Sequence, residues 1–199
     1  MKRFFASCVG ILAIAFSWTA VAADAQNQTI SLQPPAGLAQ EACPAPIWSG
    51  VTAVWGGVTD TRADKAVGTQ TKKGEEPIDV SANPPLDQVL NASLKELFAV
   101  CGIKFVDKGD ANTLKISADI KQFHAGLQKK FFTGSAQASS MLTFTIDKGY
   151  ASRTVDIGMD MESKDVRKGD IKGLTKALNS LLVATLKEIP AKKQLLDLK

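Results

Sequence analysis

The sequence predicts an α+β fold: a two-layer sandwich in which a mainly antiparallel sheet carries two amphipathic helices on one face. Leucines recur at helical spacing in two segments, one on each side of a central stretch. In that stretch hydrophobic and polar residues alternate along three consecutive strands. Strands with one polar face are typical of an antiparallel sheet that has one face open to water. The length of 199 residues allows one domain of ordinary size.

The first 25 residues have the three-part layout of a secretory signal peptide. Lys2 and Arg3 supply positive charge, an uncharged apolar stretch runs from Phe4 to Ala20, and small residues follow up to Ala25. No later apolar run reaches the roughly 18 residues that span a bilayer. We therefore predict a cleaved signal peptide over residues 1–25 and no transmembrane segment in the mature chain. An uncleaved membrane anchor is the alternative.

Residues 26–46 are rich in Gln, Ala and Pro, which predicts an extended leader with one short strand over 29–32 and little core of its own. A single domain is expected over residues 47–199. It begins with a Val-rich and Trp-rich strand over 47–58, whose glycines suggest a bulge or a close backbone approach. A polar excursion over 60–76 and a short strand over 77–80 follow.

The two helices have clear boundaries in the sequence. The first is predicted over Pro84 to Cys101, because proline suits the first helical turn and Gly102 stands where a helix-ending glycine belongs. The second is predicted to begin near Asp170 and to be interrupted by Pro190.

Period-two alternation predicts strands over 114–121, 132–146 and 154–162. The second strand carries three small residues on its apolar face, Gly134, Ala136 and Ala138. These residues would let a helix approach the sheet closely, or leave room for an apolar ligand.

Two of the three cysteines are predicted to form a disulfide bond. Cys8 falls within the signal peptide, whereas Cys43 and Cys101 remain in a chain exported to an oxidising compartment. Their bond would tie the N-terminal segment to the end of the first helix; two buried free thiols are the alternative. No acylated cysteine follows the apolar stretch, so we expect no lipid anchor.

Few residues offer chemistry. The chain has one histidine, His124, which is expected at a turn or on the surface, and no phosphate-binding glycine motif. The carboxylates of Asp156, Asp160 and Glu162 share the polar face of one strand, where lysines of a neighbouring strand offer charge partners. We expect no catalytic residues, metal ions or cofactors. The net charge of +4 is too small to indicate a nucleic-acid partner.

The order of elements resembles the YajG-like family of uncharacterised envelope lipoproteins from Gram-negative bacteria. The resemblance covers nearly the whole mature chain and implies a periplasmic two-layer α+β domain without assigned catalytic residues. The missing acylated cysteine is a departure from the family. The matching segments are Thr29-Ile30-Ser31-Leu32-Gln33-Pro34, Val58-Thr59-Asp60-Thr61-Arg62, Gly68, the helix ending at Gly102, Leu114-Lys115-Ile116, the Tyr150 strand and Ala177-Leu178-Asn179-Ser180-Leu181-Leu182.

These observations favour a non-enzymatic periplasmic domain that binds an envelope protein or lipid. The partner would use the open sheet face or the 60–76 excursion. An alternative is a carrier that holds a lipid or another apolar ligand between helices and sheet, and a carboxylate-dependent hydrolase is a third hypothesis. The candidate partner-contact residues are Asp60, Arg62, Lys115, Lys121 and Phe131.

Overall fold

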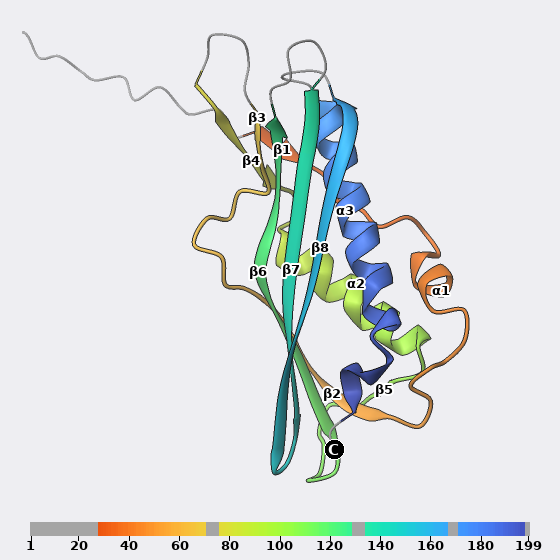
Figure 1. The fold of residues 1–199 in the computed structure, drawn as a ribbon. Helices are drawn as coiled ribbons and strands as arrows, with labels where there is room; N and C mark the ends of the chain where they lie inside the picture. Colours follow the sequence, from red (N-terminus) through yellow and green to blue (C-terminus); the bar gives the residue numbers. More distant parts are fainter. Residues whose placement is uncertain (1–27, 71–75, 129–133, 167–170, 198–199) are drawn as a thin grey trace, which may run out of the picture.

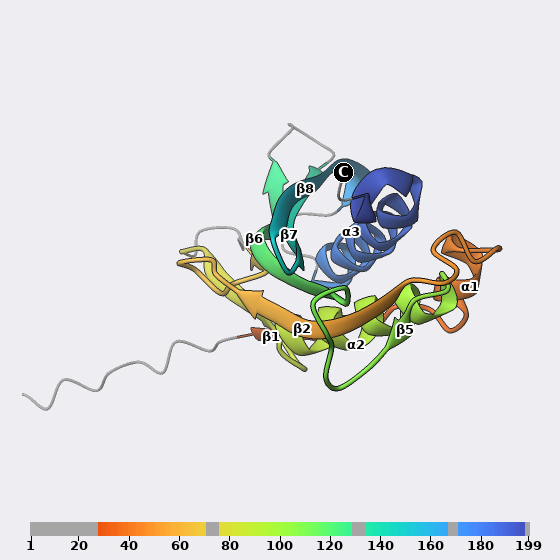
Figure 2. The same cartoon turned by 90° about the horizontal axis from the view of Figure 1, so that it is seen from below.

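The computed structural model describes residues 28–70, 76–128, 134–166 and 171–197 (Figure 1). Within them, one eight-stranded sheet packs against helices (Figure 2). The elements are β1 (Gln28–Ile30), α1 (Leu38–Ala42), β2 (Thr52–Asp60), β3 (Gly68–Gln70), β4 (Ile78–Ala82), α2 (Leu86–Val100), β5 (Lys104–Phe105), β6 (Leu114–Gln128), β7 (Gly134–Lys148), β8 (Ala151–Val166), α3 (Ile171–Ala191) and the 3-10 helix η1 (Lys193–Leu196).

The sheet is mixed, so the expectation of a mainly antiparallel sheet was wrong. β6, β7 and β8 form the expected antiparallel meander, and β3 is antiparallel to β4. The pairs β1–β4, β2–β5, β2–β6 and β3–β6 are parallel. The physical reason is the crossover: the chain leaves β2 and returns to β6 through α2, and such a connection allows parallel pairing.

Strand β6 joins the two parts of the sheet. One of its edges pairs with β7 along nearly its whole length, and the other pairs with β2 near its start and with β3 near its end. The register shifts between Ile120 and Gln122. Because of this bulge, Ile120 and Phe123 are both buried although they are three residues apart. The bulge interrupts the alternation from which the strand was predicted to end at 121. In the structure β6 continues past the bulge to Gln128.

The glycines of β2 confirm a bulge and a close approach. The register shifts between Trp55 and Gly57, and Gly57 has a φ of 88°, which favours glycine. A Cβ on Gly56 would lie 3.1 Å from the Cβ of Ser117. Neighbouring strands can therefore approach here only because no side chain intervenes.

Helices α2 and α3 pack against the same face of the sheet. The rings of Phe98 in α2 and Phe144 in β7 are 6.0 Å apart, and the hydroxyl oxygens of Thr185 in α3 and Ser140 in β7 are 2.6 Å apart. Phe144 and Ser140 share one face of β7 because they are four residues apart. Leucines of both helices belong to one buried core. Among the described residues, no helix is both long and apolar enough to cross a membrane.

The segment before β2 differs from the predicted leader in two respects, the first of which is that it contains helix α1. Its residues also enter the core, where Leu32, Leu38 and Cys43 are buried. The disulfide between Cys43 and Cys101 is confirmed and joins the end of α1 to the end of α2 across 58 residues. The N-terminal segment is therefore packed onto the domain by apolar contacts and by a covalent bond.

Candidate functional site

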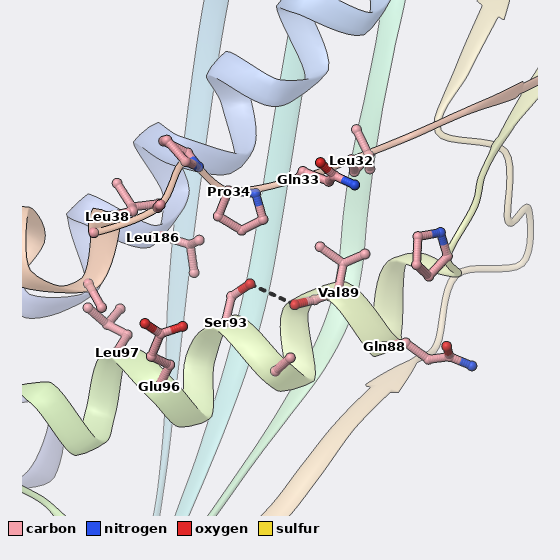
Figure 3. A pocket seen from close by; sticks show the side chains of 16 residues that line it. Leu32, Gln33, Pro34, Leu38, Gln88, Val89, Ser93, Glu96, Leu97 and Leu186 are labelled. Carbon is pink, nitrogen blue, oxygen red and sulfur yellow. Dashed lines mark hydrogen bonds between the residues drawn. The ribbon is translucent and has the colours of Figure 1, made fainter.

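A groove of about 490 Å³ lies between α2 and residues 31–37, which we call the strap (Figure 3). The strap runs from β1 to α1 and faces α2 along most of its length, from Gln88 to Leu97, while α3 lies behind both. Five buried aliphatic side chains line the groove: Leu32, Leu38, Val89, Leu97 and Leu186. Its volume is in the range of small-molecule sites, about 300–1,000 Å³.

The strap is held at both ends. At the β1 end, β1 pairs with β4, and the backbone nitrogen of Asn83 donates to the carbonyl of Ile30. From α3, the side chain of Asn179 accepts from the backbone nitrogen of Gln33 at 3.0 Å. Beyond the strap, Lys187 of α3 forms an ion pair with Glu41 of α1. The two walls of the groove are thus tied to the rest of the domain by contacts that involve no ligand.

Polar groups are few in the groove. Gln33, Gln88 and Glu96 line it but are exposed to solvent. The hydroxyl of Ser93 donates to the carbonyl of Val89 at 2.7 Å within α2, as the dashed line in Figure 3 shows. The buried part of the groove is therefore apolar, with polar side chains where it opens to water.

Asp60 and Arg62 lie together at the end of β2, but they bind each other and the backbone. The Arg62 guanidinium donates from Nε and Nη2 to the two carboxylate oxygens of Asp60, at 2.9 and 2.7 Å. Its Nη1 donates to the carbonyls of Phe123 and Ala66 at 2.7 and 2.9 Å. The Arg62 side chain is only 7% exposed. This pair fixes the turn after β2 against β6. Both residues also line a hollow of about 510 Å³, so their contact with a partner stays a prediction.

The electrostatics of Asp60 agree with this structural role. Burial of the carboxylate raises its pKa, but the hydrogen bonds and the charge of Arg62 together outweigh burial, so the pKa lies below its ordinary value of 3.8. Asp60 is therefore charged at neutral pH and stabilises Arg62 in its buried position.

The other candidate contact residues are not brought to one site. Lys115 and Lys121 lie on the polar face of β6 and are exposed, and Lys121 pairs with Asp119 at 3.2 Å. Phe131 lies outside the described residues. Whether the two lysines contact a partner stays a prediction.

His124 lies in the middle of β6 and not at a turn. It lines a polar hollow of about 560 Å³ on the open sheet face, together with Ser139, Asp160 and Glu162. Its Nε2 is 3.2 Å from the hydroxyl of Thr69. Burial lowers the pKa of His124 below 6.5, the nearby Arg62 lowers it further, and Asp64 and Asp79 oppose the shift. Among the described residues, no three His, Cys, Asp or Glu side chains are placed to hold a metal ion.

The space that the small residues of β7 leave is filled by α3. Ala136 is fully buried and packs against Ala177, and Ala138 is 3% exposed.

The groove under the strap was not predicted from the sequence, because nothing in the Pro-rich segment indicates that this segment lies across α2. The two leucines of this segment, Leu32 and Leu38, were the one indication in the sequence that part of it is buried.

Comparisons with known proteins assign a family but no activity. No curated protein matches the chain. One similar crystal structure is described as an uncharacterised protein; it is 12% identical, covers 84% of this chain and 99% of its own, and has a TM-score of 0.46. Another, a putative neuraminyllactose-binding hemagglutinin homolog from Helicobacter pylori, is 10% identical, with coverages of 77% and 86% and a TM-score of 0.39. The model of a family described as uncharacterised lipoproteins matches residues 55–197, so the chain belongs to that family.

Proposed function

We propose that this protein is a non-enzymatic periplasmic domain, exported by a cleaved signal peptide, that binds an acyl chain of an envelope lipid in the strap groove. Membership of a lipoprotein family and the Cys43–Cys101 disulfide both indicate an envelope or periplasmic location. Within that family we assign the chain to the YajG-like group. The structural observation that carries the proposal is the groove itself, with its buried aliphatic lining and its two fixed walls.

A fixed groove favours binding because little order has to be created when the ligand enters. Asn179 holds the strap from the α3 side, and the disulfide connects α1 to α2. An apolar ligand gains about 25 cal/mol for each Å² of its own apolar surface that leaves water in the groove. The five aliphatic side chains, each at most 8% exposed, supply the apolar contacts.

The lining favours an acyl chain over an extended peptide. A peptide would bring N–H and C=O groups that need partners once they are buried. The α2 wall offers few, because its backbone groups bond within the helix, and Pro34 and Pro35 of the strap have no N–H. An acyl chain has no such requirement, and its polar head can stay in water near Gln33, Gln88 and Glu96.

The test uses the purified protein and a fluorescent fatty acid whose emission rises in apolar surroundings. Ala92 is an exposed residue of α2 that lines the groove, so Ala92→Trp places an indole in it. We expect saturable binding by the wild type and a loss of roughly tenfold or more in affinity for Ala92→Trp, since the ring occupies the space of the ligand.

Ala99→Trp is the matched control. Ala99 is also exposed on α2, two helical turns further on, and it does not line the groove. This variant should bind the probe like the wild type. If the wild type shows no saturable binding, or if both variants lose it equally, the proposed function is wrong.

A further inference from the structure

The outer edge of β8 is the longest unpaired strand edge that the described residues present. β8 runs over 16 residues, Ala151–Val166, and pairs only with β7 (Figure 1). Near its start, Arg153 donates to the carbonyl of Asp197, so the C-terminal segment lies beside that end. Unpaired edges present free backbone N–H and C=O groups, which can hydrogen-bond to another strand.

Two rows of side chains flank this edge. On the open face, Asp156, Gly158, Asp160 and Glu162 are all exposed. On the core face, Val155, Met159 and Met161 are hydrophobic and only partly buried, although they pack against the core. A strand added beside β8 would bury more of this apolar row and lie next to the acidic row.

We propose that the β8 edge binds an extended segment of a partner protein, in which basic residues alternate with apolar ones. The added strand would extend the sheet by backbone hydrogen bonds, its basic side chains would lie on the open face, and its apolar side chains would cover Met159 and Met161. Binding by strand addition obtains affinity from the backbone and specificity from alternate side chains. This proposal does not depend on the strap groove.

The carboxylates along β8 favour a partner segment with basic residues. Among the described residues, the carboxylates of Asp156 and Asp160 form no ion pair; Asp156 accepts a hydrogen bond from Thr143 at 2.6 Å. Lys121, on the same face, is already paired with Asp119 on β6, two strands away. Opposite charges on neighbouring strands stabilise pairing, and like charges destabilise it.

The same charges disfavour a second copy of this chain as the strand that pairs with β8. In a symmetric antiparallel pair centred on Gly158, Asp156 of one copy would lie directly opposite Asp160 of the other, on the same face. Centring the pair on Met159 would instead place Asp156 opposite Glu162. Self-pairing along this stretch therefore brings carboxylates together, which costs free energy.

The test measures binding of a capped nine-residue peptide of alternating lysine and valine to the purified protein by isothermal titration calorimetry. Two further peptides separate the contributions: one has glutamate at the lysine positions, and one is N-methylated at every residue, which keeps the charges but removes the hydrogen-bond donors from both edges of the peptide. We expect only the first peptide to bind, with an affinity that falls as salt is added.

Two charge-reversal variants locate the site. D156K/D160K should weaken binding of the basic peptide by roughly tenfold or more, since two favourable charge pairs become repulsive. D119K/D147K changes the net charge equally but alters residues of β6 and β7, and it should bind within about twofold of the wild type. Hydrogen exchange should show new protection of β8 amides when the peptide is bound, with α2 unchanged.

Three outcomes would overturn the proposal: equal binding of the N-methylated peptide, equal affinity of D156K/D160K and the wild type, or protection that excludes β8. A dimer of the full chain that protects β8 without any peptide would show that the occupant is a second copy. The fatty-acid assay of Ala92→Trp reports separately on the groove, so either proposal can fail alone.

Discussion

The meander β6–β8 and the N-terminal part of the domain, residues 28–105, are held together by different means. The meander consists of strands of 15 or 16 residues, each paired with its neighbour in sequence. The N-terminal part has strands of two to nine residues and two parallel pairs of its own, β1–β4 and β2–β5. Its strap is fixed from outside by Asn179, and its two helices are joined by the disulfide.

The two regions therefore differ in whether the contacts that stabilise them are local or long-range in the sequence. Sequential antiparallel strands close short loops, whereas parallel pairs need a crossover and the ordering of a longer chain. Both regions still share one core, since Phe98 of α2 contacts Trp48, Trp55 and Phe144. Removing a contact that both regions share should therefore act on the whole domain, and removing the disulfide should act mainly on the N-terminal part.

The largest effect is expected from Phe98→Ala. Phe98 is fully buried where α2 meets the meander, so the substitution removes contacts with both regions and leaves a cavity. The free energy of unfolding should fall by about 3–5 kcal/mol, measured by urea denaturation. Hydrogen exchange should accelerate in both regions together.

Tyr150→Ala is the control for loss of an aromatic ring, because Tyr150 is 91% exposed. It should change stability by less than about 0.5 kcal/mol. If Phe98→Ala accelerated exchange in only one region, the two regions would be independent units and not one core.

The next largest effect is expected from the double variant C43A/C101A. Opening the 58-residue loop should lower the free energy of unfolding by about 2–4 kcal/mol. Because the bond joins α1 to α2, amides of α1 and of the end of α2 should exchange faster than those of the meander.

A reducing agent supplies the control. It should lower the stability of the wild type to that of C43A/C101A and leave the double variant unchanged. Equal acceleration of exchange throughout the meander would contradict the view that the disulfide acts mainly on the N-terminal part.

The smallest effect is expected at His124, where the two regions meet across Thr69. Burial lowers the pKa of His124, so an NMR titration of the only histidine in the chain should give a value below 6.5. Since the folded state resists protonation, stability should decline as the pH falls below 6.5 and level off once the folded-state pKa is passed.

His124→Gln should remove this part of the pH dependence. The acid-induced loss that remains should include the contribution of Asp60, whose pKa is lowered in the folded state; that contribution is present above 3.8 and is lost as the pH falls through the folded value. A His124 pKa at or above 6.5 would show that its surroundings on the sheet are more polar than the structure indicates.

The elements with strong periodicity were predictable from the sequence. The leucine spacing predicted a helix over 84–101, and α2 covers Leu86–Val100. Alternation predicted the three meander strands, and two cysteines in a chain that we expect to be exported predicted the disulfide. Each of these inferences rests on one segment or one pair of residues. For the helix and the strands, burial of one face of the element imposes a period on its sequence.

Long-range arrangement was not predictable in the same way. A polar face on each strand is typical of antiparallel sheets and therefore predicted the wrong pairing here, since the crossover through α2 makes β2 run parallel to β6. The bulge after Ile120, which moves Phe123 into the core and His124 onto the open face, has no period of its own.

Helices α2 and α3, the meander strands and the cysteine pairing followed from the sequence, since each depends on local periodicity or residue type. Helix α1 did not, because its short segment has no such period. The packing of distant segments decided two further features: the strap crosses α2 to form a groove, and the guanidinium of Arg62 donates to the backbone of β6. The same packing places β8 at the end of the sheet, where within the described part of the chain its acidic outer edge pairs with no strand. Such features depend on which distant segments meet, and that choice is made by packing of the whole core.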